Sequence, residues 1–240
     1  MTREWFESWF GEEYVALYPH RNETEAERAV DLVERTVGNV TVSRVLDLAC
    51  GAGRHSRVLA KRWWTTGLDL SEVLLRLARR ESATTALVRG DMRVLPFRNA
   101  AFGLVVNLFT SFGYFQDDES HLRVVREVAR VTSHGGTFVI DFLNATRIRQ
   151  SLVPYDEREI GGRVVEQRRE ISDDGRFVVK RISIRGSDKI FTERVRLLGP
   201  DDLRRLLDSA GFDVTTAYGN YDASPLTPES PRVILFGTLR

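Results

Sequence analysis

The sequence predicts an α/β protein with a doubly wound, mostly parallel sheet of seven strands and a small antiparallel β insert. Short apolar runs alternate with amphipathic helical segments over residues 43–142, and two further apolar runs close the chain. This alternation favours parallel pairing with helices on both faces, which requires strands that are apolar on both sides. Over residues 158–197 polar and apolar residues alternate instead, with Asp174-Gly175 as a hairpin turn, so an antiparallel insert is expected there.

The individual elements follow from residue spacing and from residues that begin or end helices. Helices are expected over residues 3–18, 23–37 and 54–62, after the N-cap Ser71, around residues 122–129, and from Pro200 to Gly211. Strands of the large sheet are expected at residues 45–48, 65–70, 86–88, 104–106, 137–140, 214–218 and 233–239. Strands of the insert, which we expect to attach to the large sheet, are placed at residues 163–171, 177–184 and 190–197.

The length of 240 residues fits one main domain with small additions. We expect an N-terminal helical cap over residues 1–40 and a main domain made of residues 41–157 and 198–240. Residues 158–197 then form the insert, either as a substrate lid or as a contact between subunits.

Composition limits the kinds of binding partner that we expect. The formal net charge is +1, which does not require a nucleic acid or an anionic membrane. The single cysteine, Cys50, excludes an intramolecular disulfide and a cysteine-rich metal site, so no metal is expected and a reducing cytoplasm is favoured. We expect no secretory signal and no membrane association, because the first residues are acidic and aromatic and no apolar run reaches spanning length.

The strongest chemical signal is the run from Val45 to Arg54, in which a strand leads through a glycine-rich turn into a helix. Glycines allow a ligand close to the backbone, and a helix N-terminus offers free N–H groups. A nicotinamide-binding turn has three glycines, whereas here Ser56 occupies the third position. That difference disfavours a nicotinamide oxidoreductase.

This run resembles motif I of the class I S-adenosylmethionine-dependent methyltransferases, in which an acid is followed by a loop of small residues. Four further segments resemble the later motifs in the correct order, so the resemblance covers roughly residues 43–142. They are Gly67-Leu68-Asp69-Leu70-Ser71, Gly90-Asp91-Met92, the segment from Phe102 to Leu108, and the segment from Gly135 to Asp141. The resemblance implies a Rossmann-like methyltransferase fold with S-adenosylmethionine as the cofactor.

The resemblance also implies which residues hold the cofactor. Asp69 would accept both ribose hydroxyls, Asp91 would accept from the adenine amino group, and Arg54 is a candidate for the methionine carboxylate. The full set of expected cofactor residues is Asp47, Ala49, Gly51, Gly53, Arg54, Asp69, Leu70, Asp91, Met92, Asn107, His20 and Arg21. Taken singly, each acid could instead cap a turn or a helix, and Arg54 could be a solvated helix residue.

The expected substrate face lies beyond Asn107, where the chain is unusually aromatic. The candidate substrate residues are Phe112, Tyr114, Phe115, Tyr221 and Arg232, although the phenylalanines could equally be core. Tyr114 or His121 could act as a base, but methyl transfer needs no fixed catalytic set.

The methyl acceptor itself is not named by the sequence. Amino methylation of adenine in this superfamily goes with a proline pair, which is missing from Asn107-Leu108-Phe109-Thr110. Methylation of cytosine at C5 needs a cysteine nucleophile, and the single cysteine, Cys50, lies in the cofactor loop. A small molecule with an oxygen or nitrogen nucleophile is therefore favoured over nucleic acid. A methyltransferase for RNA or protein, and a non-catalytic module that binds S-adenosylmethionine, remain alternatives, and a homodimer is open.

Overall fold

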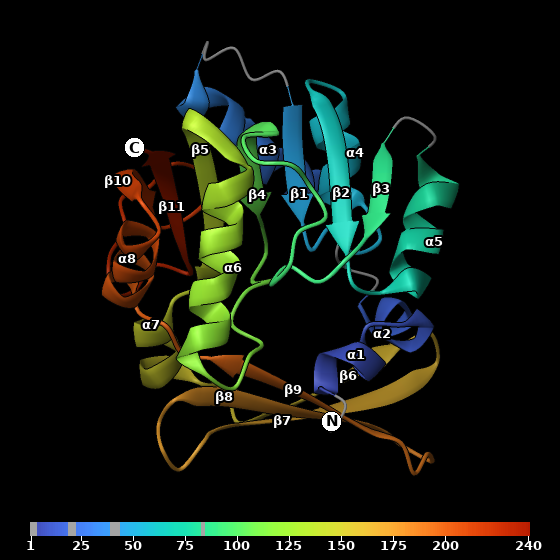
Figure 1. The fold of residues 1–240 in the computed structure, drawn as a ribbon. Helices are drawn as coiled ribbons and strands as arrows, with labels where there is room; N and C mark the ends of the chain where they lie inside the picture. The colour runs from blue at the N-terminus through green and yellow to red at the C-terminus, as the bar shows by residue number, and fades with distance from the viewer. Residues whose placement is uncertain (1–3, 19–22, 39–43, 83–84) are drawn as a thin grey trace.

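Seven strands form one large sheet in the order β10-β11-β5-β4-β1-β2-β3 (Figure 1). A computed structural model describes residues 4–18, 23–38, 44–82 and 85–240. The strands are β1 (Arg44–Leu48), β2 (Trp64–Asp69), β3 (Ala86–Arg89), β4 (Phe102–Asn107), β5 (Thr132–Leu143), β10 (Phe212–Tyr218) and β11 (Arg232–Leu239). Strands β1 to β5 pair in parallel, and β11 runs antiparallel to both β5 and β10. The predicted doubly wound, mostly parallel sheet of seven strands is confirmed.

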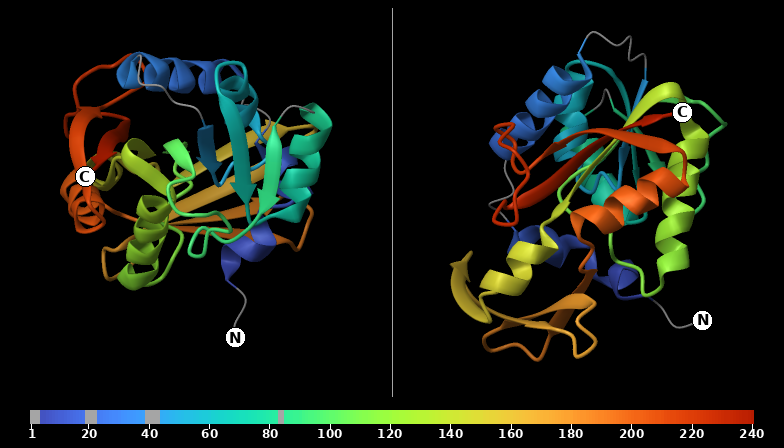
Figure 2. Two further views of the ribbon diagram at one scale, coloured as in Figure 1. Left: turned by 45° about the horizontal axis from the view of Figure 1, so that its top comes forward. Right: turned by 90° about the vertical axis from the view of Figure 1, so that its left-hand side faces the viewer.

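Helices cover both faces of this sheet. They are α3 (Glu23–Val37), α4 (Arg54–Ala60), α5 (Glu72–Glu81), α6 (Asp118–Val131) and α8 (Pro200–Ser209). Successive strand side chains point to opposite faces, so Leu46 packs in the core with α6 and α8, whereas Val45 packs in the core with α3 and α4. Figure 2 shows α3 (blue) and α6 (yellow-green) on opposite sides of the sheet. The central strands β1, β4 and β11 are therefore mostly apolar because both of their faces are buried.

Three helix boundaries follow the chemistry expected from the sequence. The Ser71 hydroxyl accepts the Leu74 N–H at 3.2 Å and caps α5. Pro200 begins α8, where its missing N–H costs no helical hydrogen bond. Gly211 follows that helix with φ of 92°, a backbone region in which residues with a Cβ are strained.

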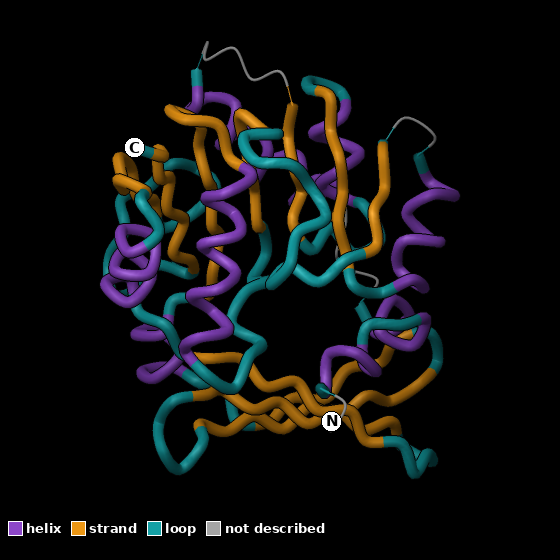
Figure 3. The backbone as a smooth tube through the Cα atoms, viewed as in Figure 1, coloured by secondary structure: helices purple, strands orange, loops and turns teal. Residues whose placement is uncertain are grey.

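The insert forms a sheet of its own rather than an extension of the large one. Its strands, in antiparallel order, are β6 (Tyr155–Ile160), β7 (Arg163–Ile171), β8 (Phe177–Ile184) and β9 (Ile190–Arg196). The expected attachment is wrong: in the described chain no strand pairing joins the two sheets. The short helix α7 (Ala145–Ser151) separates β5 from β6, and the insert lies as a second layer beyond the ends of β1 and β2 (Figures 1 and 3).

The N-terminal segment packs against this second sheet. The single helix expected over residues 3–18 is instead two helices, α1 (Trp5–Trp9) and α2 (Glu12–Leu17), because the extended backbone of Gly11 interrupts the helix. A separate apolar core joins the two parts, made of Trp9, Leu17, Tyr18, Val165, Ile182 and Ile184. The second sheet therefore buries one face under the start of the chain.

The helices of the described chain are short. The α3 helix has 15 residues and includes several charged ones. In the part of the chain that the structure describes, no helix combines the length and the apolar character needed to cross a bilayer. Within the same residues, no cluster of three or more histidine, cysteine, aspartate or glutamate side chains is arranged to hold a metal ion.

Candidate cofactor and acceptor site

A cavity of about 600 Å³ lies between the carboxyl ends of the parallel strands and the insert sheet. The loops after β1, β2, β3 and β4 form one side of it, and α1, α2 and strands β7 to β9 contribute to the other side. Ligands of open α/β sheets bind in this position, outside the carboxyl ends of the strands. The cavity is therefore the candidate site, and its two sides differ in chemistry.

The glycine-rich turn after β1 brings its main chain to the cavity. Ala49 and Gly51 line the cavity, and both have left-handed backbones, with φ of 61° and 57°. Beneath the turn, the buried Asp47 carboxylate accepts a hydrogen bond of 2.5 Å from Ser56 Oγ. Burial raises the pKa of Asp47 to about 6, opposed by the hydrogen bond from Ser56. Asp47 thus supports the turn from below.

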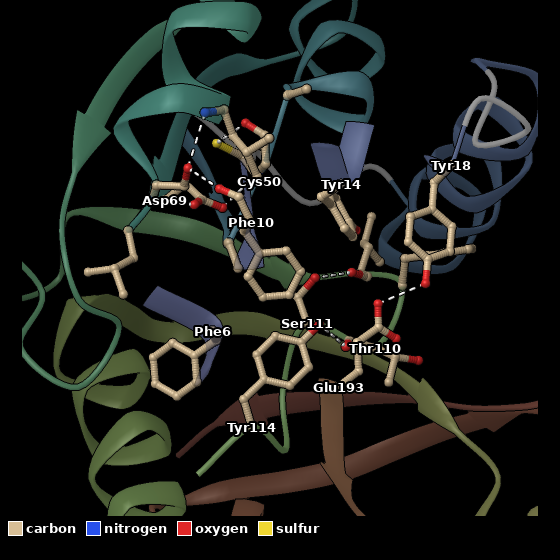
Figure 4. Close-up of a pocket in the computed structure, with 18 of the residues that line it drawn as sticks. Phe6, Phe10, Tyr14, Tyr18, Cys50, Asp69, Thr110, Ser111, Tyr114 and Glu193 are labelled. Atoms are coloured by element: carbon tan, nitrogen blue, oxygen red, sulfur yellow. Dashed lines mark hydrogen bonds between the residues drawn. The ribbon is translucent and has the colours of Figure 1, made fainter. Parts of the chain in front are cut away.

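Asp69 lies at the end of β2 and lines the same cavity (Figure 4). One carboxylate oxygen accepts the Gly51 N–H and the other accepts the Ser71 N–H, both at 2.8 Å. Burial raises the pKa of Asp69, and these two hydrogen bonds oppose the rise. Each oxygen keeps a further lone-pair site, so the fixed carboxylate has the capacity to accept two more donors.

Leu70, Asp91 and Met92 continue this wall. Arg93 binds Asp91 through Nη2 and Nε at 2.6 and 3.0 Å and also pairs with Glu4 at 2.9 Å. Burial on its own would raise the pKa of Asp91, but the hydrogen bonds from Arg93 outweigh burial and lower it. Asp91 is therefore a fixed carboxylate, tied through Arg93 to the start of the chain.

Arg54, in the first turn of α4, brings a positive charge to the cavity. Its Nη1 pairs with Glu25 at 2.8 Å, and its guanidinium lies 4.2 Å from the centre of the Phe109 ring. Among the described residues, Nη2 of Arg54 is buried and has no hydrogen-bond partner. A buried donor without a partner is costly, and a ligand carboxylate would satisfy it.

Three expected cofactor residues, Asp47, Gly53 and Asn107, do not line the cavity, and His20 and Arg21 lie outside the described residues. Gly53 has φ of 80°, and an added Cβ would lie 2.9 Å from Ala78 Cβ, so this glycine lets α4 pack against α5. Asn107 is fully buried and donates from Nδ2 to the Leu48 carbonyl at 2.9 Å, which joins the ends of β4 and β1.

Phe112 and His121, a predicted cavity wall and a possible base, are in the core instead. Both are about 1% exposed, and their rings pack edge-on at 5.1 Å. His121 Nδ1 donates to the Asp117 carbonyl at 2.8 Å, and burial lowers the pKa of His121. The expectation that either side chain faces the substrate is wrong, because the α6 helix turns His121 inward.

Tyr221 and Arg232 also lie outside the cavity, contrary to the expectation that they reach it. The Tyr221 hydroxyl donates to Asp141 at 2.6 Å, and Arg232 Nε donates to the other oxygen of that carboxylate. Asp141 is fully buried on β5, so a buried charge attracts both side chains away from the cavity.

Tyr114 and Phe115 line the cavity as predicted, and the N-terminal helices add aromatic rings that we had not expected there. The added residues are Trp5, Phe6, Phe10, Tyr14 and Tyr18. The Trp5 and Tyr114 rings meet edge-on at 5.1 Å, and the Tyr114 hydroxyl donates to the Thr110 carbonyl at 2.8 Å. The aromatic spacing of α1 and α2 was the available signal for this wall.

A buried polar group stands at the insert side of the cavity (Figure 4). The Glu193 carboxylate of β9 accepts from Trp9 Nε1 at 2.9 Å, from the Tyr18 hydroxyl at 2.8 Å and from Lys180 Nζ at 2.6 Å. Burial alone would raise the pKa of Glu193, but the charge and hydrogen bond of Lys180 outweigh burial and lower it. The cavity thus has acids and an arginine at one end and a neutralised ion pair with aromatic rings at the other.

Known proteins that are similar to this chain are methyltransferases. The family described as a methyltransferase domain matches residues 45–136. A phthiotriol/phenolphthiotriol dimycocerosates methyltransferase of Mycobacterium leprae is 30% identical over 200 residues, which cover 73% of this chain and 70% of that protein. The chain belongs to the class I S-adenosylmethionine-dependent methyltransferases.

Other methyltransferases are similar over different lengths. A dTDP-3-amino-3,4,6-trideoxy-alpha-D-glucopyranose N,N-dimethyltransferase of Streptomyces venezuelae is 34% identical, and the match spans 53% of this chain and about half (54%) of that relative. The crystal structure of a methyltransferase from Clostridium acetobutylicum superposes with a TM-score of 0.81 at 20% identity, covering 95% of this chain and 96% of the other. That likeness establishes the methyltransferase fold over nearly the whole chain.

Proposed function

We propose that the chain transfers the methyl group of S-adenosylmethionine to a small-molecule acceptor. The observation that carries this proposal is the placement of two groups in one cavity: the fixed Asp69 carboxylate and the buried Arg54 Nη2 without a partner among the described residues. A carboxylate suits the hydroxyls of a ribose, and a guanidinium suits the carboxylate of a methionine. The cofactor carries both groups, so the residues present fit it.

The other cofactor contacts follow from the same orientation. Ala49 and Gly51 would lie along the cofactor, and Leu70, Asp91 and Met92 would hold its adenine end. Bound S-adenosylmethionine supplies a methyl group already activated by its positive sulfonium. The residues of this chain then need to align the acceptor and exclude water, which accounts for much of the rate of such a displacement.

The acceptor would occupy the insert side of the cavity. The aromatic rings of α1, α2 and Tyr114 exclude water there, and Glu193, Lys180 and Tyr18 offer polar contacts near the far wall. Apolar walls with a few placed polar groups are typical of small-molecule sites. The Streptomyces relative methylates a nucleotide-linked amino sugar according to its name, which supports an oxygen or nitrogen nucleophile on a small molecule. In this arrangement the insert and the N-terminal segment together act as the substrate lid.

The first test is calorimetric titration of the purified protein with S-adenosylhomocysteine, with NAD as the control ligand. We expect micromolar binding of S-adenosylhomocysteine and no heat of binding from NAD. A panel of amino sugars and hydroxylated lipids would then be screened for methylated product by mass spectrometry. Absence of S-adenosylhomocysteine binding would overturn the proposal at the level of the cofactor. Binding without turnover on any acceptor would favour the non-catalytic alternative.

A further inference from the structure

The loop after β4 contains two consecutive residues in an unfavourable backbone conformation. Phe109 and Thr110 have φ of 63° and 60°, the left-handed region in which a Cβ crowds the following carbonyl. Both residues line the cavity. Such a conformation persists when surrounding contacts enforce it, and strained residues gather at functional sites.

The contacts that enforce it come from Asp141 of β5. The Asp141 carboxylate accepts the Phe109 N–H at 2.8 Å, and its main-chain carbonyl accepts the Thr110 N–H at 2.9 Å. Arg232 Nε and the Tyr221 hydroxyl donate to the same carboxylate, the latter at 2.6 Å. The carboxylate is fully buried, so three donors fix its orientation and, through it, the loop.

The loop in turn holds the Phe109 ring beside Arg54. The Phe109 ring lies 4.2 Å from the Arg54 guanidinium and 5.0 Å from that of Arg232. A cation over an aromatic face is attracted to the ring, most strongly where water is excluded. Together with the ion pair to Glu25, this ring fixes Arg54 with its Nη2 free of partners among the described residues.

We propose that Asp141, Arg232 and Tyr221 are positioning residues for the amino-acid end of the cofactor. They act through Phe109, whose ring seats Arg54 against the carboxylate of the methionine moiety. This inference rests on the proposed function, since it assumes that S-adenosylmethionine occupies the cavity. It assigns a role to two side chains that never touch the cavity and that come from the closing hairpin.

The test compares two ligands that differ in the amino-acid end. S-adenosylhomocysteine has it, and 5′-methylthioadenosine lacks it. Phe109→Leu removes the ring and keeps an apolar side chain, and we expect it to weaken S-adenosylhomocysteine binding about tenfold. Tyr221→Phe removes one hydrogen bond to Asp141, and we expect about threefold weakening. Binding of 5′-methylthioadenosine should change by less than about twofold in both variants.

Matched controls separate positioning from general destabilisation. Phe177→Leu removes another ring that stacks on an arginine, Arg194 at 3.8 Å, outside the cavity. Tyr155→Phe removes a hydroxyl bonded to Glu157 on the exposed edge of the insert. We expect both controls to leave the affinity for the two ligands unchanged.

The possible outcomes separate a failure of the proposed function from a failure of the positioning role. If the native protein binds neither ligand, the proposed function fails with the positioning role. If it binds both ligands equally well, the cofactor reading stands and the positioning role is overturned. The positioning role is also overturned if Phe109→Leu weakens the binding of both ligands equally, or if it does not weaken the binding of S-adenosylhomocysteine. Thermal unfolding of each variant checks that it is folded. If Phe109→Leu does not fold, the affinities of Tyr221→Phe provide the test.

Discussion

The indole Nε1 of Trp9 donates a hydrogen bond of 2.9 Å to the carboxylate of Glu193, across 184 positions of the chain. The same carboxylate pairs with Lys180, so one buried charge joins the first helix to two strands of the insert. The wall of the cavity on this side therefore depends on a contact between the beginning of the chain and its last third.

Glu193→Gln should destabilise the fold by about 3 kcal/mol, because it removes the negative charge that pairs with the largely buried Lys180 ammonium. The glutamine side chain has nearly the same shape and still accepts hydrogen bonds from Trp9 and Tyr18. The loss in free energy of unfolding therefore reports the missing charge of Glu193. Urea unfolding measures it. Glu170→Gln breaks an ion pair with Arg181 whose side chains are about half exposed, and should cost less than about 1 kcal/mol. Equal losses in the two variants would contradict a buried pair.

Asp69→Ala should weaken S-adenosylhomocysteine binding by about 1.5–3 kcal/mol, since a hydrogen bond to a charged group is lost together with its anchoring of Gly51. Calorimetry provides the measurement. Asp213→Ala, which removes an exposed partner of Arg240, serves as the control and should bind as the native protein does. An unchanged affinity in Asp69→Ala would refute the ribose assignment.

The stability of the protein should fall relative to Asp47→Asn as the pH rises from about 4 to about 6. The pKa of Asp47 is raised to about 6 in the fold by burial, from 3.8, so the neutral form is favoured there. The stability linked to this group is fully present below pH 3.8 and is lost as the pH rises through about 6, by about 3 kcal/mol in total. Unfolding free energies of both proteins across this range give the difference. A constant difference would show that Asp47 titrates normally.

Gly53→Ala should cost more stability than Gly186→Ala, although the two glycines have nearly the same φ, 80° and 81°. The left-handed backbone costs about 1 kcal/mol for alanine at either position. At Gly53 the new Cβ also meets Ala78 Cβ at 2.9 Å, whereas nothing lies within 4 Å at Gly186. We therefore expect Gly53→Ala to lose at least about 1 kcal/mol more in urea unfolding. Equal costs would mean that α4 and α5 separate freely.

The features of the fold and the site that were predicted correctly are those that short-range sequence patterns determine. The order of strands and helices was predicted except for α7, β6 and the break between α1 and α2. This order, the N-cap at Ser71 and the end of α8 at Gly211 depend on residues within a few positions of one another. The turn at Gly51 and the acid at Asp69 were found in the same way, since each lies at or just after the carboxyl end of a buried strand.

Contacts between distant segments were not predictable. Whether Phe112 or Tyr114 faces the cavity depends on how α6 and α1 pack around the loop, and no short-range spacing encodes that. We expected Tyr221 and Arg232 at the cavity, yet both side chains donate to the buried Asp141 instead. The pairing of Glu193 with Lys180 likewise appears only when β8 and β9 align.

Most of the proposed acceptor wall belongs to segments that contribute no strand to the large sheet: α1, α2 and strands β7 to β9 of the insert. Substitutions there leave the strands and loops around Asp69 intact, so a lineage could change what it methylates without rebuilding how it holds its methyl donor. Exchange of these two segments between paralogues, provided that both partners of the Trp9–Glu193 contact move together, is then a practical route to new acceptors in the laboratory.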